Sequence, residues 1–266
     1  MSAIDELFLR LRSEGKRALM PFITAGDPDL EFTASLIKAL DDAGCHLCEV
    51  GIPYSDPIAD GPVIQASYTR ALNSKIKLTQ IFEAISGVAD SISMPLVTMV
   101  SFAIIYRHGV ESFVESARAA GFSGAIVPDL PTEESTLVAE VFERNDFSLI
   151  PLITPAIPEA RATAIAEKAT GFIYYVSVTG ITGERNEIPD SVVANVQRLK
   201  QLTQLPICIG FGISKPNHVE MLAPVADGLI VGSAIVRRIG DAKPNRYDET
   251  INEIKEYVTG LLDCLN

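Results

Sequence analysis

The sequence has few of the features that mark membrane or nucleic-acid-binding proteins. None of its apolar runs approaches the roughly 18 residues that a membrane-spanning helix needs. Basic residues number 22 against 34 acidic residues, which leaves a net charge of −12 at pH 7. Such an acidic chain is unsuited to nucleic acid or to an anionic membrane surface. A phosphate ligand would therefore have to be held locally, by backbone amides.

Cysteine is also scarce, with four residues in 266, which is too few for a disulfide framework. Cys45 and Cys48 have the spacing of a zinc-binding pair, but no second pair follows and both lie in an apolar run. We expect buried thiols there, and neither a metal nor another cofactor. The first twelve residues include Asp5 and Glu6 and do not resemble a signal peptide, so the sequence predicts a cytoplasmic protein.

The chain does contain a regular alternation of apolar runs and helical patterns. The runs expected to form strands are 18–25, 45–49, 95–101, 124–128, 148–154, 172–178, 206–211 and 228–231. Strands that are apolar on both faces and alternate with helices indicate a buried parallel sheet. The sequence therefore predicts one α/β domain over residues 1–266, a (β/α)8 TIM barrel with an extra amphipathic helix at the N-terminus. A doubly wound sheet is the alternative, but no Gly-x-Gly-x-x-Gly motif follows the first strand.

The stretch 49–65 carries the clearest chemical pattern. It reads E-V-G-I-P-Y-S-D-P-I-A-D-G-P-V-I-Q, with Glu49 ending an apolar strand and Asp60 on a proline-rich loop. A buried carboxylate is costly unless it is paired, hydrogen-bonded or neutralised. Two carboxyl groups in such different settings can have pKa values pushed apart, which suits acid–base catalysis. Alternatively, Glu49 pairs with a basic residue, and Asp60 and Asp56 only build turns.

Glycine-rich segments end or follow the last three expected strands. They are Gly180-Ile181-Thr182-Gly183, Gly210-Phe211-Gly212-Ile213-Ser214 and Gly232-Ser233. Glycine lets backbone amides approach an anion, and a helix N-terminus adds free N–H donors. This corner commonly binds phosphate in TIM barrels, so the pattern predicts a phosphate site.

Residues 49–67 resemble the signature of the tryptophan synthase alpha chain family, and the similarity extends through the glycine-rich segments. The resemblance implies a lyase of L-tryptophan biosynthesis that cleaves indole-3-glycerol phosphate to indole and glyceraldehyde 3-phosphate without a cofactor. It assigns catalysis to Glu49, Asp60 and Tyr174, the last of which we expect at the barrel mouth together with Tyr175. It assigns the indole pocket to Phe22 and Phe211, which the residues alone would place in the barrel core. It assigns phosphate binding to Thr182, Gly183, Gly212, Gly232 and Ser233.

The resemblance also implies a partner, the beta chain of tryptophan synthase, in an α2β2 assembly. In the family, one contact with that chain is the loop that here carries Pro53, Asp56 and Pro57. Another is the loop after the third strand, which commonly reads M-x-Y-x-N. Ser101 and Ala103 replace the Tyr and Asn of this motif. The sequence therefore predicts weaker coupling to a beta chain than in members that keep both residues.

Three other functions remain open at this stage. A free-standing lyase that releases indole would keep both carboxylates but not the partner. A phosphate-binding barrel isomerase of histidine or tryptophan biosynthesis would share the glycine segments but need not carry the pattern through Asp60. A non-catalytic regulatory subunit would bind a glycerol phosphate without turnover.

Overall fold

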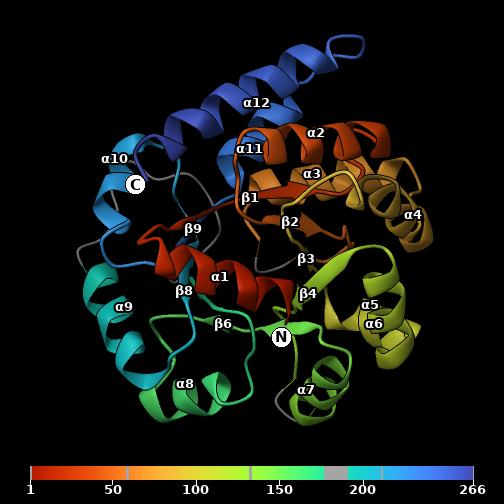
Figure 1. Cartoon of the computed structure of the whole chain (residues 1–266). Coiled ribbons are helices and arrows are strands. Elements are labelled where there is room, and N and C mark those ends of the chain that lie inside the picture. The colour runs from red at the N-terminus through yellow and green to blue at the C-terminus, as the bar shows by residue number, and fades with distance from the viewer. Residues whose placement is uncertain (1, 58–59, 132–133, 177–190, 211, 266) are drawn as a thin grey trace.

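The computed structural model describes residues 2–57, 60–131, 134–176, 191–210 and 212–265, and its strands form one parallel sheet (Figure 1). The strands are β1 (Ala18–Thr24), β2 (Cys48–Gly51), β3 (Leu96–Met99), β4 (Phe122–Ile126), β5 (Ser148–Ile150), β6 (Leu152–Ile153), β7 (Ile173–Val176), β8 (Ile207–Gly210) and β9 (Gly228–Val231). The helices are α1 (Ala3–Ser13), α2 (Leu30–Asp42), α3 (Pro62–Asn73), α4 (Leu78–Ala89), α5 (Phe102–His108), α6 (Val110–Ala119), α7 (Ser135–Arg144), α8 (Glu159–Ala166), α9 (Ser191–Leu202), α10 (Pro216–Leu222), α11 (Ser233–Gly240) and α12 (Tyr247–Leu262). The strand order is β5-β4-β3-β2-β1-β9-β8-β7-β6.

The barrel closes through the short stretch that contains β5 and β6. These strands stand at the two ends of the order, yet only Pro151 separates them along the chain. Proline has no N–H to donate, so the expected strand 148–154 is interrupted at this residue. Strand β5 pairs with β4 and β6 pairs with β7, and the same stretch thereby joins both sides of the sheet. The predicted TIM barrel is confirmed.

Helix α1 covers one end of this barrel, as Figure 1 shows. Its residues Ile4, Leu7, Phe8 and Leu11 are buried and form one apolar cluster with inward-facing side chains from the strands. The hydroxyl of Ser148 donates to that of Ser2, at 2.9 Å, and ties the start of the helix to β5. The extra N-terminal helix is therefore confirmed, and it leaves the C-terminal ends of the strands for a functional site.

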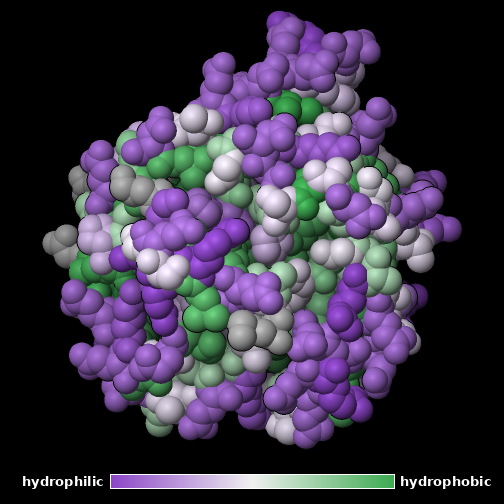
Figure 2. All heavy atoms as spheres, in the orientation of Figure 1, coloured by the Kyte–Doolittle hydropathy of each residue, from purple (hydrophilic) through white to green (hydrophobic). Residues whose placement is uncertain are grey.

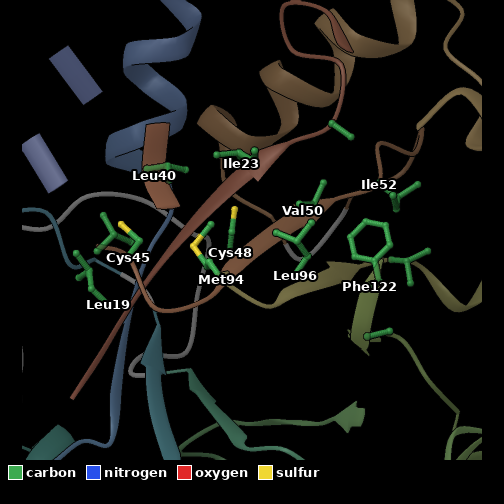
Figure 3. Packing of buried hydrophobic residues seen from close by; sticks show 14 of the residues in the cluster. Leu19, Ile23, Leu40, Cys45, Cys48, Val50, Ile52, Met94, Leu96 and Phe122 are labelled. Atoms are coloured by element: carbon green, nitrogen blue, oxygen red, sulfur yellow. The ribbon is translucent and has the colours of Figure 1, made fainter. Parts of the chain in front are cut away.

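A second apolar cluster fills the layer between the barrel and its outer helices. Figure 3 shows Cys45 and Cys48 in this layer, among Leu40, Met94 and other apolar side chains. Burial raises the pKa of the Cys45 thiol to about 12, with a further contribution from the charge of Asp41. Both thiols are buried, as expected, and the described residues contain no group of three or more potential metal ligands.

Helix α5 was not predicted. It has only seven residues and includes Ile104 and Ile105, whose branched side chains lower helix propensity. Two side chains fix its start. The Ser101 hydroxyl accepts a hydrogen bond from the N–H of Ala103 at 3.3 Å, and Asp129 accepts one from the N–H of Phe102 at 2.7 Å. Because Asp129 lies beyond β4, this stabilisation comes from tertiary structure.

Hydrophilic residues cover most of the face seen in Figure 2, which is the face that carries α1. Within the described ranges, no helix combines the length and hydropathy that crossing a membrane requires.

Candidate active site

Glu49 lies inside the barrel, near the C-terminal end of β2. The register places it beside Phe22 of β1 and Val97 of β3, and its side chain is 0% exposed. Neither carboxyl oxygen has a hydrogen-bond partner among the described residues. Burial raises the pKa of Glu49 well above its ordinary value. The alternative in which Glu49 pairs with a basic residue therefore finds no support in this part of the chain, and the neutral acid is the stable form.

The layer above Glu49 is formed by an aromatic ring and a phenol. Gly51 follows Glu49 by two residues and therefore faces the same side of β2. A Cβ atom at Gly51 would lie 2.7 Å from Cζ of Phe22 and 3.1 Å from the Tyr68 hydroxyl. Both side chains are almost fully buried. They share an apolar cluster with Ile64 of α3 and Val236 of α11. Glu49 therefore lies below a layer of largely apolar side chains, the kind of lining that suits a flat hydrophobic ligand.

Asp60 lies on the loop between β2 and α3, immediately before the N-cap residue of that helix. Its N–H donates to the carbonyl of Pro57 at 3.1 Å, and Gln65 Nε2 donates to the carbonyl of Asp60 at 2.7 Å. The backbone of Asp60 thus forms a turn, as the alternative for this residue supposed, but its side chain is half-buried. Burial raises the pKa of Asp60 to about 6. This carboxyl group is therefore mainly ionised at pH 7, in contrast to Glu49.

Tyr174 projects into the barrel from β7. Its ring and hydroxyl lie against Gly210 of β8, at the place where any larger residue would put its Cβ atom. Burial raises the pKa of Tyr174 well above 10, and the nearby carboxyl groups of Glu49 and Asp60 raise it further. The structure therefore brings all three predicted catalytic side chains to one end of the barrel. Tyr175 points the other way, because side chains alternate along a strand, and the prediction that it faces the mouth is wrong.

The predicted phosphate-binding residues lie on adjacent segments after β8 and β9, where the structure describes them. Gly212 has φ +81°, a conformation that favours glycine. Gly232 is the N-cap residue of α11 and Ser233 begins that helix, with no side chain capping its first N–H groups. Free N–H groups at this position can bind an anion. Thr182, Gly183 and Phe211 lie outside the described residues.

One of the residues predicted to contact a partner, Pro53, lines an open groove of about 410 Å³. It is lined by Ile52, Pro53, Ile76, Leu78, Ile81, Ile104, Arg107 and His108. Asp56 is exposed and Pro57 half-buried. Ala103 is exposed, whereas Ser101 is 4% exposed and donates from its hydroxyl to Asp129 at 2.6 Å. Of the two residues that depart from the family motif, only Ala103 can contact a partner directly.

Sequence reasoning missed two tyrosines at this site. Tyr54 packs against Tyr68 in a tilted arrangement with ring centroids 5.5 Å apart, and burial together with the charges of Asp60 and Asp129 raises the pKa of Tyr54 to about 12. Tyr68 had a detectable signal, because it follows Ile64 by four residues on an expected helix and so shares its face. The pattern gave no way to tell that this face borders the site.

The parallel barrel, with a buried acid and a second, ionised carboxylate at the C-terminal ends of its strands, places this protein in the class of TIM-barrel enzymes. Residues 8–263 match the sequence model of the family described as tryptophan synthase alpha chain. The chain is 53% identical over 245 residues to the tryptophan synthase alpha chain of Rhodopirellula baltica, which covers 91% of this chain and 88% of that one. It belongs to the tryptophan synthase alpha chain family.

Solved structures agree with this assignment. The tryptophan synthase alpha subunit of Legionella pneumophila str. Paris superposes with a TM-score of 0.90 at 31% identity, over 100% of this chain and 98% of that one. Tryptophan synthase from M. tuberculosis, in an aminoacrylate-bound form, gives a TM-score of 0.88 at 26% identity over 100% of both chains. Tryptophan synthase alpha chains are lyases that cleave indole-3-glycerol phosphate, and they act with a beta subunit. The main function predicted from the sequence is thereby supported over the isomerase and the non-catalytic subunit.

Proposed function

We propose that Glu49 is the acid–base residue in the cleavage of indole-3-glycerol phosphate by this chain. The observation that carries the proposal is the complete burial of a carboxyl group that has no described partner at the C-terminal end of the barrel. Such a group holds its proton near neutral pH and can transfer it to a substrate bound next to the apolar side chains above it.

The reaction needs one proton delivered and one removed. A proton is added to C3 of the indole ring, and a proton leaves the hydroxyl group on the adjacent glycerol carbon. The bond between these two carbons then breaks, its electron pair restores the aromatic ring, and the glycerol carbon becomes the aldehyde of glyceraldehyde 3-phosphate. Glu49 is the group we assign to this proton transfer, and Tyr174 lines the pocket beside it.

Asp60 has the complementary role. Protonation of C3 places positive charge on the ring nitrogen, and an ionised carboxylate near the ring N–H stabilises that charge mainly in the transition state. Its pKa of about 6 leaves it charged at pH 7, while the deeper burial of Glu49 keeps that group neutral. Phe22 and Phe211 are the proposed walls of the indole pocket.

The phosphate group is proposed to bind at the opposite side of the mouth. Gly212, Gly232 and Ser233 would contribute backbone N–H groups there, together with Thr182 and Gly183. The left-handed backbone of Gly212 and the uncapped first turn of α11 support this placement. A binding site made from backbone groups also fits a chain with a net charge of −12.

The proposed partner is a tryptophan synthase beta chain in an α2β2 assembly. Pro53 lines the open groove, and Asp56 is exposed on the same loop as Asp60, so a partner bound here could order the loop that carries a catalytic group. A free-standing lyase that releases indole is the second candidate, and the small side chain of Ala103 at this face favours it.

One assay separates these possibilities. The purified chain is incubated with indole-3-glycerol phosphate and indole is measured, with and without a tryptophan synthase beta chain. We expect indole from the chain alone and a higher rate with the partner. An unchanged rate with a beta chain would favour the free-standing enzyme, and no indole under either condition would refute the assignment of catalysis.

A further inference from the structure

Ser214, in the connection between β8 and α10, is held through both of its backbone polar groups. Its N–H donates to Nδ1 of His218 at 3.3 Å, and its carbonyl accepts a hydrogen bond from the Tyr257 hydroxyl at 2.9 Å. His218 is 1% exposed and belongs to α10, whereas Tyr257 lies far along the chain in α12. Figure 1 shows the end of α12 beside α10, in agreement with the contacts between the two helices.

These two side chains have an unusual importance because Ser214 is in neither a helix nor a strand. In a helix or strand, backbone hydrogen bonds to neighbouring residues fix the position of the chain. Outside such elements, the backbone N–H and C=O groups depend on side chains as hydrogen-bond partners. Ser214 follows Gly212 by two residues, and Gly212, in a left-handed conformation, has no Cβ atom to restrict its backbone. The position of the Gly212 N–H group therefore depends on what holds Ser214.

Tyr257 also contacts the helix that forms the other half of the proposed phosphate site. The guanidinium of Arg238, in α11, lies 3.9 Å from the centroid of the Tyr257 ring. Arg238 donates from its guanidinium to the carbonyl of Ala234 at 2.7 Å, one turn back along α11. That turn begins at Ser233. One tyrosine thus contacts the segment after β8 through its hydroxyl and α11 through its ring.

We propose that Tyr257 and His218 are positioning residues for the phosphate group of the substrate. They hold the segment Gly212–Ser214 in a fixed place relative to the N-terminus of α11, so that N–H groups from both segments meet the same anion. Groups held in place before binding lose less entropy when the ligand arrives, and affinity rises accordingly. This inference rests on the proposed phosphate site. It gives α10 and α12, which carry His218 and Tyr257, a role in positioning that site without contact with the ligand.

The test is the substitution Tyr257→Phe, which removes the hydroxyl and keeps the ring on Arg238. We expect the Kd for glycerol 3-phosphate, measured by calorimetry, and the KM for indole-3-glycerol phosphate to rise about three- to tenfold, the effect of one hydrogen bond. We expect kcat to stay within about twofold and the Kd for indole, which carries no phosphate, to stay unchanged. A general loss of structure would alter all four quantities.

Two further substitutions test the other side of Ser214. His218→Leu should raise the same Kd, and His218→Asn should restore it, because the Asn Oδ1 can accept from the Ser214 N–H where Nδ1 did. Tyr247→Phe is the matched control, since Tyr247 lies in the same helix but packs against Phe32 with ring centroids 5.2 Å apart.

The outcomes separate this inference from the phosphate site itself. If the parent chain does not bind glycerol 3-phosphate and Gly212→Val leaves KM unchanged, the phosphate site is misplaced. If the parent binds it but Tyr257→Phe and His218→Leu bind it as tightly, the site stands and the positioning role is overturned. Weaker binding in both, with rescue by His218→Asn and none of the effect in Tyr247→Phe, supports the role.

Discussion

At the scale of single residues, the proposed site combines one carboxyl group kept neutral with another kept charged. Glu49 has no described hydrogen-bond partner, so the cost of ionising it in apolar surroundings holds its proton. Asp60 is half-buried, with a pKa of about 6. The difference between the two follows from depth in the barrel, since burial is the largest cause of both shifts.

Glu49→Gln should keep the fold and abolish most of the catalysis. The amide matches the carboxyl group in size but cannot transfer a proton, so kcat should fall at least about 100-fold, the lower end of general acid–base effects. Binding of glycerol 3-phosphate should not change. The measurement is indole release by the purified variant, with circular dichroism to show that it is folded. Retention of more than about a tenth of the parent kcat would contradict the role.

Asp60→Asn should affect both activity and stability, each with a characteristic dependence on pH. The pKa of Asp60 is raised from 3.8 to about 6 in the folded chain, so the stability it contributes is present below pH 4 and lost as pH rises through 6. The variant should therefore be more stable than the parent at pH 8, by about 1–2 kcal/mol after allowing for solvent screening, and the gain should shrink toward pH 5. Urea unfolding at both pH values measures this.

Catalytic activity should depend on pH in the opposite direction to stability. Because the ionised form of Asp60 is the proposed catalyst, kcat/KM of the parent should fall as pH drops below about 6, and kcat of Asp60→Asn should be low at every pH. The exposed Asp56, on the same loop, is the matched control. Equal loss of activity without a beta chain in Asp56→Asn and Asp60→Asn would show that the roles on this loop are divided wrongly.

At the scale of elements, α1 is held in the barrel by a few apolar side chains. Phe8 is 5% exposed, and its ring centroid lies 5.7 Å from that of Phe172. Phe8→Ala should lower the free energy of unfolding by about 3–5 kcal/mol. Leu9, its neighbour, is 55% exposed, so Leu9→Ala should change it by less than about 0.5 kcal/mol. Similar losses in both variants would mean that α1 does not pack as described.

The elements also show what could be predicted from the sequence. The strands were found because apolar runs between glycine and proline signals are local, and Glu49 was found because the ends of parallel strands gather at one place. Helix α5 was missed because its start depends on Asp129, which is distant in sequence. Tyr175 was misplaced because strand direction alone does not say which residue of a pair faces inward.

At the scale of the whole molecule, only one of the two residues that differ from the M-x-Y-x-N motif lies on the surface where a partner could bind. Ser101 is buried against Asp129 and is the N-cap residue of α5, so a tyrosine there would disturb the start of the helix. Ala103 is exposed and can regain the Asn of the motif without strain. Ala103→Asn should tighten binding of a beta chain about fivefold, the effect of one hydrogen bond near 1 kcal/mol.

The measurement is a titration with a beta chain, following affinity and the rate of indole formation. The matched control is Ala119→Asn, at an exposed position on α6. If the parent chain is already strongly activated and Ala103→Asn binds no tighter, the replacement of the motif has no consequence for coupling.

Helix α1 has a consequence for the path of the products. Among the described residues, its apolar face and the inward-facing side chains fill the barrel from the N-terminal end, so we expect a ligand to reach Glu49 from the C-terminal ends of the strands. We then expect the substrate to enter and both products to leave at that same end. The fate of the indole would then depend on what covers this end of the barrel. If the end is exposed, indole is released to the solvent, and if a partner protein is bound there, indole passes directly to it.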